Sequence, residues 1–249
     1  DLFIKEVHSE IIVKAGQKCT AVRRVMVPEH LLDHVQAALI DRLSQTTIGN
    51  PRHPKTRMGA LVSLSQRQDV LEKAAKIGAE AQCVFGSEGL STVIDASAET
   101  GAFVAPRLFR CENPDQAQAV HNIEAFGPVS TIMGYRDADH AAKLLNRGQG
   151  SLVASVFTAD SGFACDMVMG SAAYHGRLYF NNAISAKEST GHGSPLPHLV
   201  HGGPGRAGSR RRVASGSVRI TIGLHDPLSH RSRRVRAPPT TRGRSDSRL

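Results

Sequence analysis

The feature that most constrains the fold is a regular alternation of strand-like and helix-like segments along residues 2–181. Short runs rich in apolar and β-branched residues predict strands, and they cover residues 22–27, 81–85, 103–109, 129–135, 152–157 and 177–181. Between them, apolar residues recur at helical spacing in segments 2–13, 29–45, 63–77, 115–121, 137–146 and 160–174. Strands that alternate with helices predict an α/β protein whose sheet is built with crossover connections.

The positive charge of the chain is confined to its C-terminal end. The net charge is +9, yet residues 206–249 hold 12 arginines, no lysine and two acids, whereas residues 1–205 carry 19 basic and 20 acidic residues. Gly, Pro and His dominate after Gly191, and Arg, Ser and Pro follow. Such a composition buries too little apolar surface to offset the entropy of ordering. We therefore predict a folded domain over 1–205 and a disordered basic tail over 206–249.

The arginine clusters at 210–212 and 231–236 raise one alternative, a non-catalytic protein whose tail binds nucleic acid. Clusters of this kind bind phosphate without sequence specificity and with strong salt dependence. No aromatic residues are interleaved with them for base stacking, so specific recognition has little support.

Cysteine and histidine spacing argues against a structural metal site. The cysteines are Cys19, Cys83, Cys111 and Cys165, and no two form a C-x-x-C pair. Three histidines could be considered a metal cluster: His192, His198 and His201. Their spacings match no zinc pattern, which favours a solvated loop and no metal. No apolar run approaches the roughly 18 residues that span a bilayer. We expect a reducing, cytoplasmic setting.

Cys19, within Gly-Gln-Lys-Cys-Thr at residues 16–20, is a candidate nucleophile. A free thiol with a pKa of about 8.5 is only a few per cent ionised at neutral pH, so a nucleophilic thiol needs exposure and a cationic neighbour or helix N-terminus. The small Gly16 lets a substrate approach the loop. Taken alone, the motif is weak evidence, because a free cysteine is more often a buried small apolar residue.

The second candidate motif is Glu-x-Phe-Gly-Pro at residues 124–128. Taken alone, Gly127-Pro128 indicates a turn before a strand, with Glu124 on the surface.

Together the two motifs resemble the aldehyde dehydrogenase superfamily, in which Gly-Gln-x-Cys is followed by Glu-x-Phe-Gly-Pro. Further stretches match the family's order at residues 145–158, 176–181 and 192–195, so that the resemblance extends from residue 1 to about 208. It implies an aldehyde dehydrogenase-like catalytic domain, with an open twisted sheet and flanking helices. Residues 1–24 and 191–208 are most similar to the dehydrogenase half of the bifunctional ring-opening enzymes of phenylacetate catabolism.

The resemblance implies a role for each motif. Cys19 would attack an aldehyde to form a thiohemiacetal, with its own backbone N–H helping to hold the oxyanion. NADP or NAD would be the oxidant, and an activated water would hydrolyse the resulting acyl-thioester. Glu124 would accept hydrogen bonds from the nicotinamide-side ribose hydroxyls, and Phe126 would pack against that end of the cofactor. The aldehyde would be a coenzyme A-linked semialdehyde, and family members assemble as homo-oligomers.

The sequence also departs from the family pattern. The family's general base is a glutamate in a Glu-Leu-Gly-Gly-type motif upstream of the cysteine, whereas only 18 residues precede Cys19 here and Glu6 and Glu10 lie in the wrong context. The Gly-rich dinucleotide-binding segment and the oxyanion-hole asparagine also lie upstream. We therefore expect a truncated product that nothing in the sequence shows to bind cofactor or turn over unaided.

The end of the match near 205–208 has a second explanation. The lysine-free Arg, Ser and Pro composition beyond it is what an out-of-frame reading of a GC-rich gene would give. We hypothesise a frameshift, which an intact in-frame continuation in sequencing reads would refute.

One further enzyme class stays open, a thiolase-like transferase that also uses a cysteine. Such an enzyme needs a histidine base beside the cysteine. No histidine stands in a sequence context that suggests this role.

Overall fold

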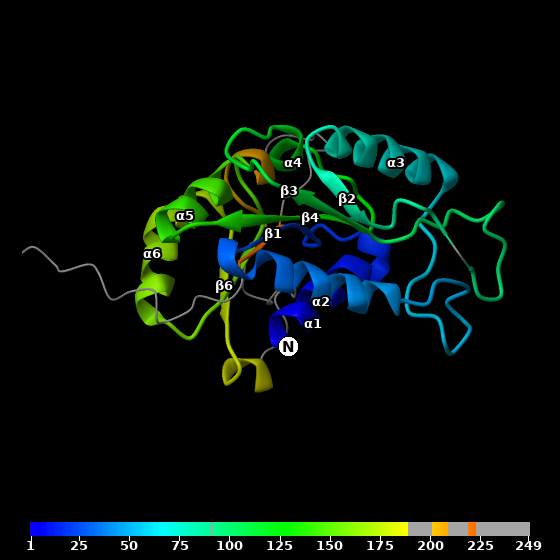
Figure 1. Ribbon diagram of the computed structural model, residues 1–249, viewed down its shortest axis with the longest axis horizontal. Coiled ribbons are helices and arrows are strands. Elements are labelled where there is room, and N and C mark those ends of the chain that lie inside the picture. Colours follow the sequence, from blue (N-terminus) through cyan, green and yellow to red (C-terminus); the bar gives the residue numbers. More distant parts are fainter. Residues whose placement is uncertain (91, 189–200, 209–218, 223–249) are drawn as a thin grey trace, which may run out of the picture.

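The computed structural model describes residues 1–90, 92–188, 201–208 and 219–222. Within these residues, seven strands form one sheet flanked by helices (Figure 1). The strands are β1 (Val22–Pro28), β2 (Gln82–Phe85), β3 (Arg107–Cys111), β4 (Val129–Tyr135), β5 (Ala154–Phe157), β6 (Leu178–Asn181) and β7 (Arg219–Ile222). The helices are α1 (Leu2–Ile12), α2 (Leu32–Ser44), α3 (Leu64–Gly78), α4 (Ala119–Asn122), α5 (Ala138–Asn146) and α6 (Ser161–Ser171). Short 3-10 turns cover Val13–Gly16, Glu29–Leu31, Ala172–Tyr174, Ser185–Lys187 and Gly205–Ala207.

The strand order is β2-β3-β4-β1-β7-β5-β6. Among these described strands, only the β2–β3 pair is antiparallel; the other neighbouring strands run parallel. In the central pair, β1 and β4 are aligned from Arg24 opposite Thr131 to Pro28 opposite Tyr135. This mainly parallel sheet with helical crossovers confirms the predicted α/β class.

The two faces of the sheet have separate apolar cores. One core joins β1 and β4 to α1 and α2, and the other joins the sheet to α3, α5 and α6. Figure 1 shows α1 and α2 on one side of β4 and α3 on the other. Val25 and Ile132 face the first core, whereas Met26 and Met133 face the second. Strands buried on both faces are typical of parallel sheets.

Two elements lie elsewhere than predicted. The strand expected at 103–109 is β3, Arg107–Cys111, because Pro106 has no backbone N–H for a ladder and pairing with β4 begins at Arg107. The helical turn expected at 115–121 is α4, Ala119–Asn122. Its start is fixed by Glu80, whose carboxylate accepts hydrogen bonds from the backbone of Gln118 (2.8 Å) and Ala119 (2.6 Å).

Strand β7 corrects the prediction of disorder for residues 219–222, which form a strand between β1 and β5. Without β7, the inner edges of β1 and β5 would leave unpaired backbone groups in the middle of the sheet. The β-branched composition Ile-Thr-Ile suits that position. The rest of the predicted tail beyond Gly208, with both arginine clusters, lies outside the described residues. No helix in the described part is long and apolar enough to cross a bilayer.

Candidate active site

The topology brings the two sequence motifs together. The Gly-Gln-Lys-Cys segment leads into β1, and the Glu-x-Phe-Gly-Pro segment leads into β4. Because β1 and β4 are parallel neighbours, their first residues lie at the same edge of the sheet (Figure 1). Segments separated by about a hundred residues therefore become adjacent, as parallel pairing requires.

Gly16 lies directly against the second motif. Its φ is +70°, a left-handed conformation that favours glycine. A Cβ on Gly16 would fall on the carbonyl group of Gly127. Both the conformation and the contact therefore require glycine at the start of the cysteine loop.

Arg23 holds the two motifs together. Its buried guanidinium donates Nη1–H to the carbonyl of Gly127 (2.8 Å) and Nη2–H to the carbonyl of Gly16 (2.7 Å). The same guanidinium lies 5.7 Å from the ring centroid of Phe126. Sequence reasoning missed this residue. The signal was present in Val22-Arg23-Arg24, because a charged side chain within an apolar buried strand needs polar partners there.

Glu124 is buried, not surface-exposed as the turn interpretation alone suggested. Its side chain is 8% exposed, and Oε1 lies 3.6 Å from Nε of Arg23. Burial raises the pKa of the Glu124 carboxyl, and the Arg23 charge opposes only part of this increase. Among the described residues, Oε1 has no hydrogen-bond partner. The buried carboxylate oxygen can therefore accept a donor from outside this set.

Phe126 is fixed through its backbone. Gln66 in α3 donates a side-chain N–H to the Phe126 carbonyl at 3.0 Å. Together with the Arg23 contact, this bond fixes the Glu-x-Phe-Gly-Pro segment from two elements. The segment is therefore part of the packed domain.

Cys19 is exposed, as a nucleophile requires. Lys18, the cation beside it in the sequence, forms an ion pair with Glu10 at 3.0 Å. The Cys19 sulfur lies 3.5 Å from Nε2 of His201. A histidine therefore lies beside Cys19, although no histidine stands in a sequence context that suggests it. Nothing in the local sequence indicated this pair, since the two residues are 182 positions apart.

The other cysteines differ from Cys19 in environment. Cys83 is half-buried, Cys111 is buried and Cys165 is exposed; all are free thiols. Burial raises the pKa of Cys111, because the thiolate form is poorly solvated there. Cys165 therefore offers the closest internal comparison for Cys19.

The aldehyde dehydrogenase family model matches residues 1–194. This chain belongs to that family. It is 41% identical over 219 residues to the 3,4-dehydroadipyl-CoA semialdehyde dehydrogenase of Aromatoleum evansii, covering 88% of this chain and 42% of that protein. It is 52% identical over 152 residues to protein MaoC of Klebsiella aerogenes, covering 61% of this chain and 44% of that protein. The chain thus spans less than half the length of these relatives.

Solved structures agree with the family assignment. HpcC from Thermus thermophilus superposes with a TM-score of 0.71 at 25% identity, covering 86% of this chain and 38% of that one. Betaine aldehyde dehydrogenase from Staphylococcus aureus, in a complex with NAD⁺, superposes with a TM-score of 0.69 at 22% identity, covering 86% and 40%. These likenesses confirm the predicted aldehyde dehydrogenase-like sheet and helices.

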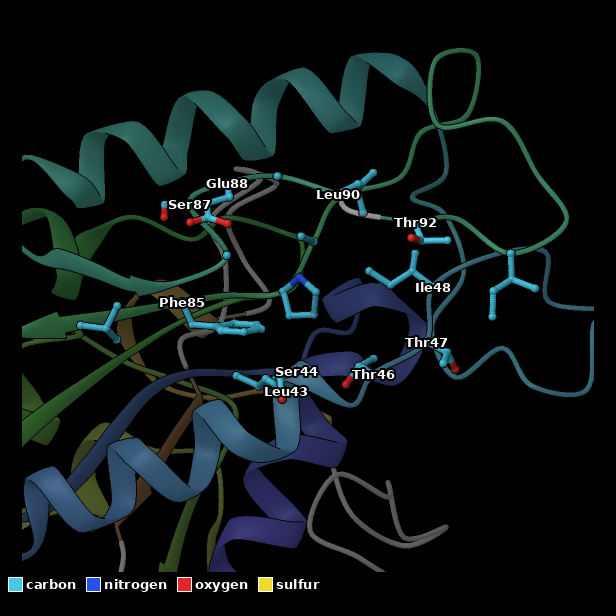
Figure 2. A pocket seen from close by; sticks show the side chains of 16 residues that line it. Leu43, Ser44, Thr46, Thr47, Ile48, Phe85, Ser87, Glu88, Leu90 and Thr92 are labelled. Atoms are coloured by element: carbon cyan, nitrogen blue, oxygen red, sulfur yellow. The ribbon is translucent and has the colours of Figure 1, made fainter.

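A cavity of about 770 Å³ lies apart from the family's two motifs. Figure 2 shows it between Leu43 and Ser44 at the end of α2, Ile48, and the loop that carries Leu90 and Thr92. This cavity belongs to the β2–β3 side of the sheet, whereas Cys19 precedes β1. None of Cys19, Glu124 and Phe126 lines it.

Of the three histidines that were considered and rejected as a metal cluster, His201 alone lies within the described residues. His192 and His198 lie outside the described residues, and His201 faces Cys19. The described part of the chain contains no group of three or more His, Cys, Asp or Glu that could hold a metal ion.

Proposed function

We propose that this chain is the nucleophile-bearing part of an enzyme that oxidises an aldehyde to a carboxylic acid with NAD or NADP. The observation that supports this most is the joining of both family motifs by one buried arginine. Arg23 bonds to the cysteine loop at Gly16 and to the Glu124 motif at Gly127.

In the proposed reaction Cys19 supplies the sulfur that attacks the aldehyde carbon. A C–S bond forms, the carbonyl π bond breaks, and the oxygen carries negative charge that a backbone N–H at Cys19 would stabilise. Water then cleaves the thioester that follows oxidation, which releases the carboxylic acid and returns the thiol.

Glu124 and Phe126 are suited to the nicotinamide end of the cofactor. Among the described residues, the buried Oε1 of Glu124 has only the long 3.6 Å contact with Nε of Arg23 and no shorter hydrogen bond, and a ribose hydroxyl would supply one. Phe126 would pack beside it, held by Gln66 and Arg23. A bound nicotinamide supplies the two-electron acceptor.

For the substrate we propose a coenzyme A-linked semialdehyde of aromatic, phenylacetate-type catabolism. The 41% identity to a protein named 3,4-dehydroadipyl-CoA semialdehyde dehydrogenase supports this choice. A cytoplasmic setting and a homo-oligomeric full-length protein stay predictions.

Protection of Cys19 by aldehyde tests the proposal without cofactor. The chain is treated with iodoacetamide in the presence of hexanal or 1-hexanol, and the alkylated peptides are quantified by mass spectrometry. Hexanal should slow alkylation of Cys19 and leave the exposed Cys165 unaffected, because a thiohemiacetal blocks only a thiol that attacks the carbonyl. The alcohol controls for apolar binding. Equal rates at Cys19 with both additives would contradict the proposal.

A further inference from the structure

We propose that Arg23 is a positioning residue for Glu124, which it holds as an anion at a fixed place relative to the cysteine loop. In this role Arg23 acts through Glu124 and Gly16, without contacting the aldehyde or the cofactor itself. The inference rests on the proposed role of Glu124 as acceptor for the ribose hydroxyls, and it adds the group that keeps this acceptor in place.

The first support is the geometry of the Arg23 guanidinium. The group is planar and rigid, and two of its nitrogens are fixed by carbonyls, Nη1 by Gly127 at 2.8 Å and Nη2 by Gly16 at 2.7 Å. The direction of Nε is therefore determined as well, and Nε lies 3.6 Å from Oε1 of Glu124. Neither of these two buried atoms has a hydrogen bond within the described part of the chain. The carboxylate thus faces the edge of the guanidinium that the carbonyls leave open.

Arg24, the next residue of β1, shows how an arginine that only supports the fold is placed. It donates to the carbonyls of Leu144 at 2.7 Å and Leu145 at 3.0 Å, and its Nη1 lies 2.7 Å from Nδ1 of His121. Among the described residues it forms no ion pair with a carboxylate. Arg23 makes the same kind of carbonyl contacts but also faces a buried carboxylate, and this difference indicates a further role.

The second support is the charge around Glu124. Burial raises the pKa of this carboxyl, and three cations from different elements oppose the increase: Arg23 of β1 first, then Lys73 of α3 and Arg206. Lys73 is paired with a carboxylate of its own helix at 2.8 Å, and Arg206 donates to a backbone carbonyl at 2.7 Å. Of the three cations only Arg23 is buried, so solvent screens its charge least.

The contacts of Arg23 reach both motifs of the candidate site. The bond to Gly16 fixes the start of the loop that carries Cys19. The contact with Glu124 fixes the proposed ribose acceptor. One side chain thereby sets the spacing between the proposed nucleophile and the proposed cofactor carboxylate.

The test follows the titration of Glu124 by NMR of the full chain labelled with ¹³C at its glutamate carboxyl carbons, and Glu124→Gln assigns the resonance. Arg23→Gln removes the charge but keeps an amide donor. It should raise the titration midpoint by at least about one pH unit, because an opposite charge at such a distance lowers a carboxyl pKa by about 1–3 units. Arg23→Lys keeps the charge and should restore at least half of that shift.

Lys73→Gln is the matched control. It removes a cation that is partly exposed and already paired in α3, so it should move the Glu124 midpoint by less than half as much as Arg23→Gln does.

A second readout needs no substitution at Arg23 and decides alone if Arg23→Gln does not fold. The ¹⁵N resonance of Arg23 Nε should shift with the Glu124 midpoint, because Nε faces the carboxylate, and this step should vanish in Glu124→Gln. An Nε resonance without the step, or a Glu124 midpoint that Arg23→Gln and Arg23→Lys change equally, would overturn the positioning role. Protection of Cys19 by hexanal does not involve Glu124, so failure of this inference and failure of the proposed function are distinguishable.

Discussion

The carboxylate side and the thiol side of the candidate site are built in different ways. Glu124 is buried and lies beside Arg23, which is itself bonded to two backbone carbonyls. Cys19 is exposed, and its contact with His201 joins segments 182 residues apart. The difference indicates that the proposed cofactor-facing side is part of the folded core, whereas the proposed nucleophile lies at the surface.

This comparison predicts that substitutions on the two sides of the site have different effects. Changes at Arg23, Gly16 and Glu124 should alter the free energy of unfolding, because each is packed inside the domain. A change at Cys19 should alter thiol chemistry and leave stability nearly unchanged, because Cys19 is exposed.

The largest stability effect is expected from Arg23→Met. The substitution removes two backbone hydrogen bonds and leaves the Glu124 carboxylate buried without its countercharge. Breaking a buried charge pair costs about 3–5 kcal/mol. Urea unfolding followed by circular dichroism measures the loss. Arg52→Met, at an exposed position, should change stability by less than about 0.5 kcal/mol. Equally small losses of unfolding free energy in both variants would contradict the role of Arg23 in the folded core.

Gly16→Ala is expected to have the next largest effect. The new Cβ would meet the backbone of Gly127 at a φ of +70°, so we expect a loss of about 3 kcal/mol. Gly89→Ala separates conformation from contact, because Gly89 has a φ of +84° and no atom of the described residues lies within 4 Å of the point that its Cβ would occupy. It should lose only about 1 kcal/mol. Similar losses would show that the Gly16–Gly127 contact is unimportant.

Glu124→Gln should change the pH dependence of stability. Burial raises the pKa of Glu124 above its ordinary value of 4.5. The folded state therefore holds this proton more tightly, and the resulting stabilisation is fully present below 4.5 and lost as pH rises through the raised value.

Above pH 4.5, stability of the unaltered chain should therefore fall relative to Glu124→Gln, by at most about 1.4 kcal/mol per pH unit. Urea unfolding from about pH 4 to about pH 8 measures the difference. Glu99→Gln, which removes an exposed carboxylate, is the control and should follow the unaltered chain. Coincident curves for Glu124→Gln and the unaltered chain would contradict the buried carboxylate.

The smallest stability effect is expected from Cys19→Ser. The exposed thiol should be replaced at a cost below about 0.5 kcal/mol. Cys111→Ser places a hydroxyl in a buried site and should cost about 1–3 kcal/mol. Thermal unfolding of both variants tests the contrast, and a large loss for Cys19→Ser would show that the cysteine loop is part of the core.

Local signals predicted the elements whose boundaries are set locally. Strand β4 has the predicted bounds, Val129–Tyr135, because a run rich in apolar and β-branched residues follows Gly127-Pro128. Helix α5 begins where Asp137 accepts a hydrogen bond from the His140 backbone, and α6 begins where Asp160 caps its first turn. In these cases the residues that determine a boundary are neighbours in the sequence.

Features that depend on contacts between residues distant in the sequence could not be predicted from sequence patterns. The start of α4 depends on Glu80, and the place of β7 depends on a gap between β1 and β5. Cys19 and Glu124 were predicted through family resemblance, and their roles stay proposals. The contacts of Arg23 and His201 were not predicted, because each residue meets a partner that is distant in the sequence.

The most direct test of the central claim, that Cys19 attacks aldehydes, uses hexanal labelled with ¹³C at its carbonyl carbon. NMR of the full chain with this aldehyde should show a thiohemiacetal carbon resonance, distinct from those of the free aldehyde and its hydrate. The resonance should be absent in Cys19→Ser and present in Cys165→Ser. A resonance that persists in Cys19→Ser, or that is lost in Cys165→Ser, would contradict the account.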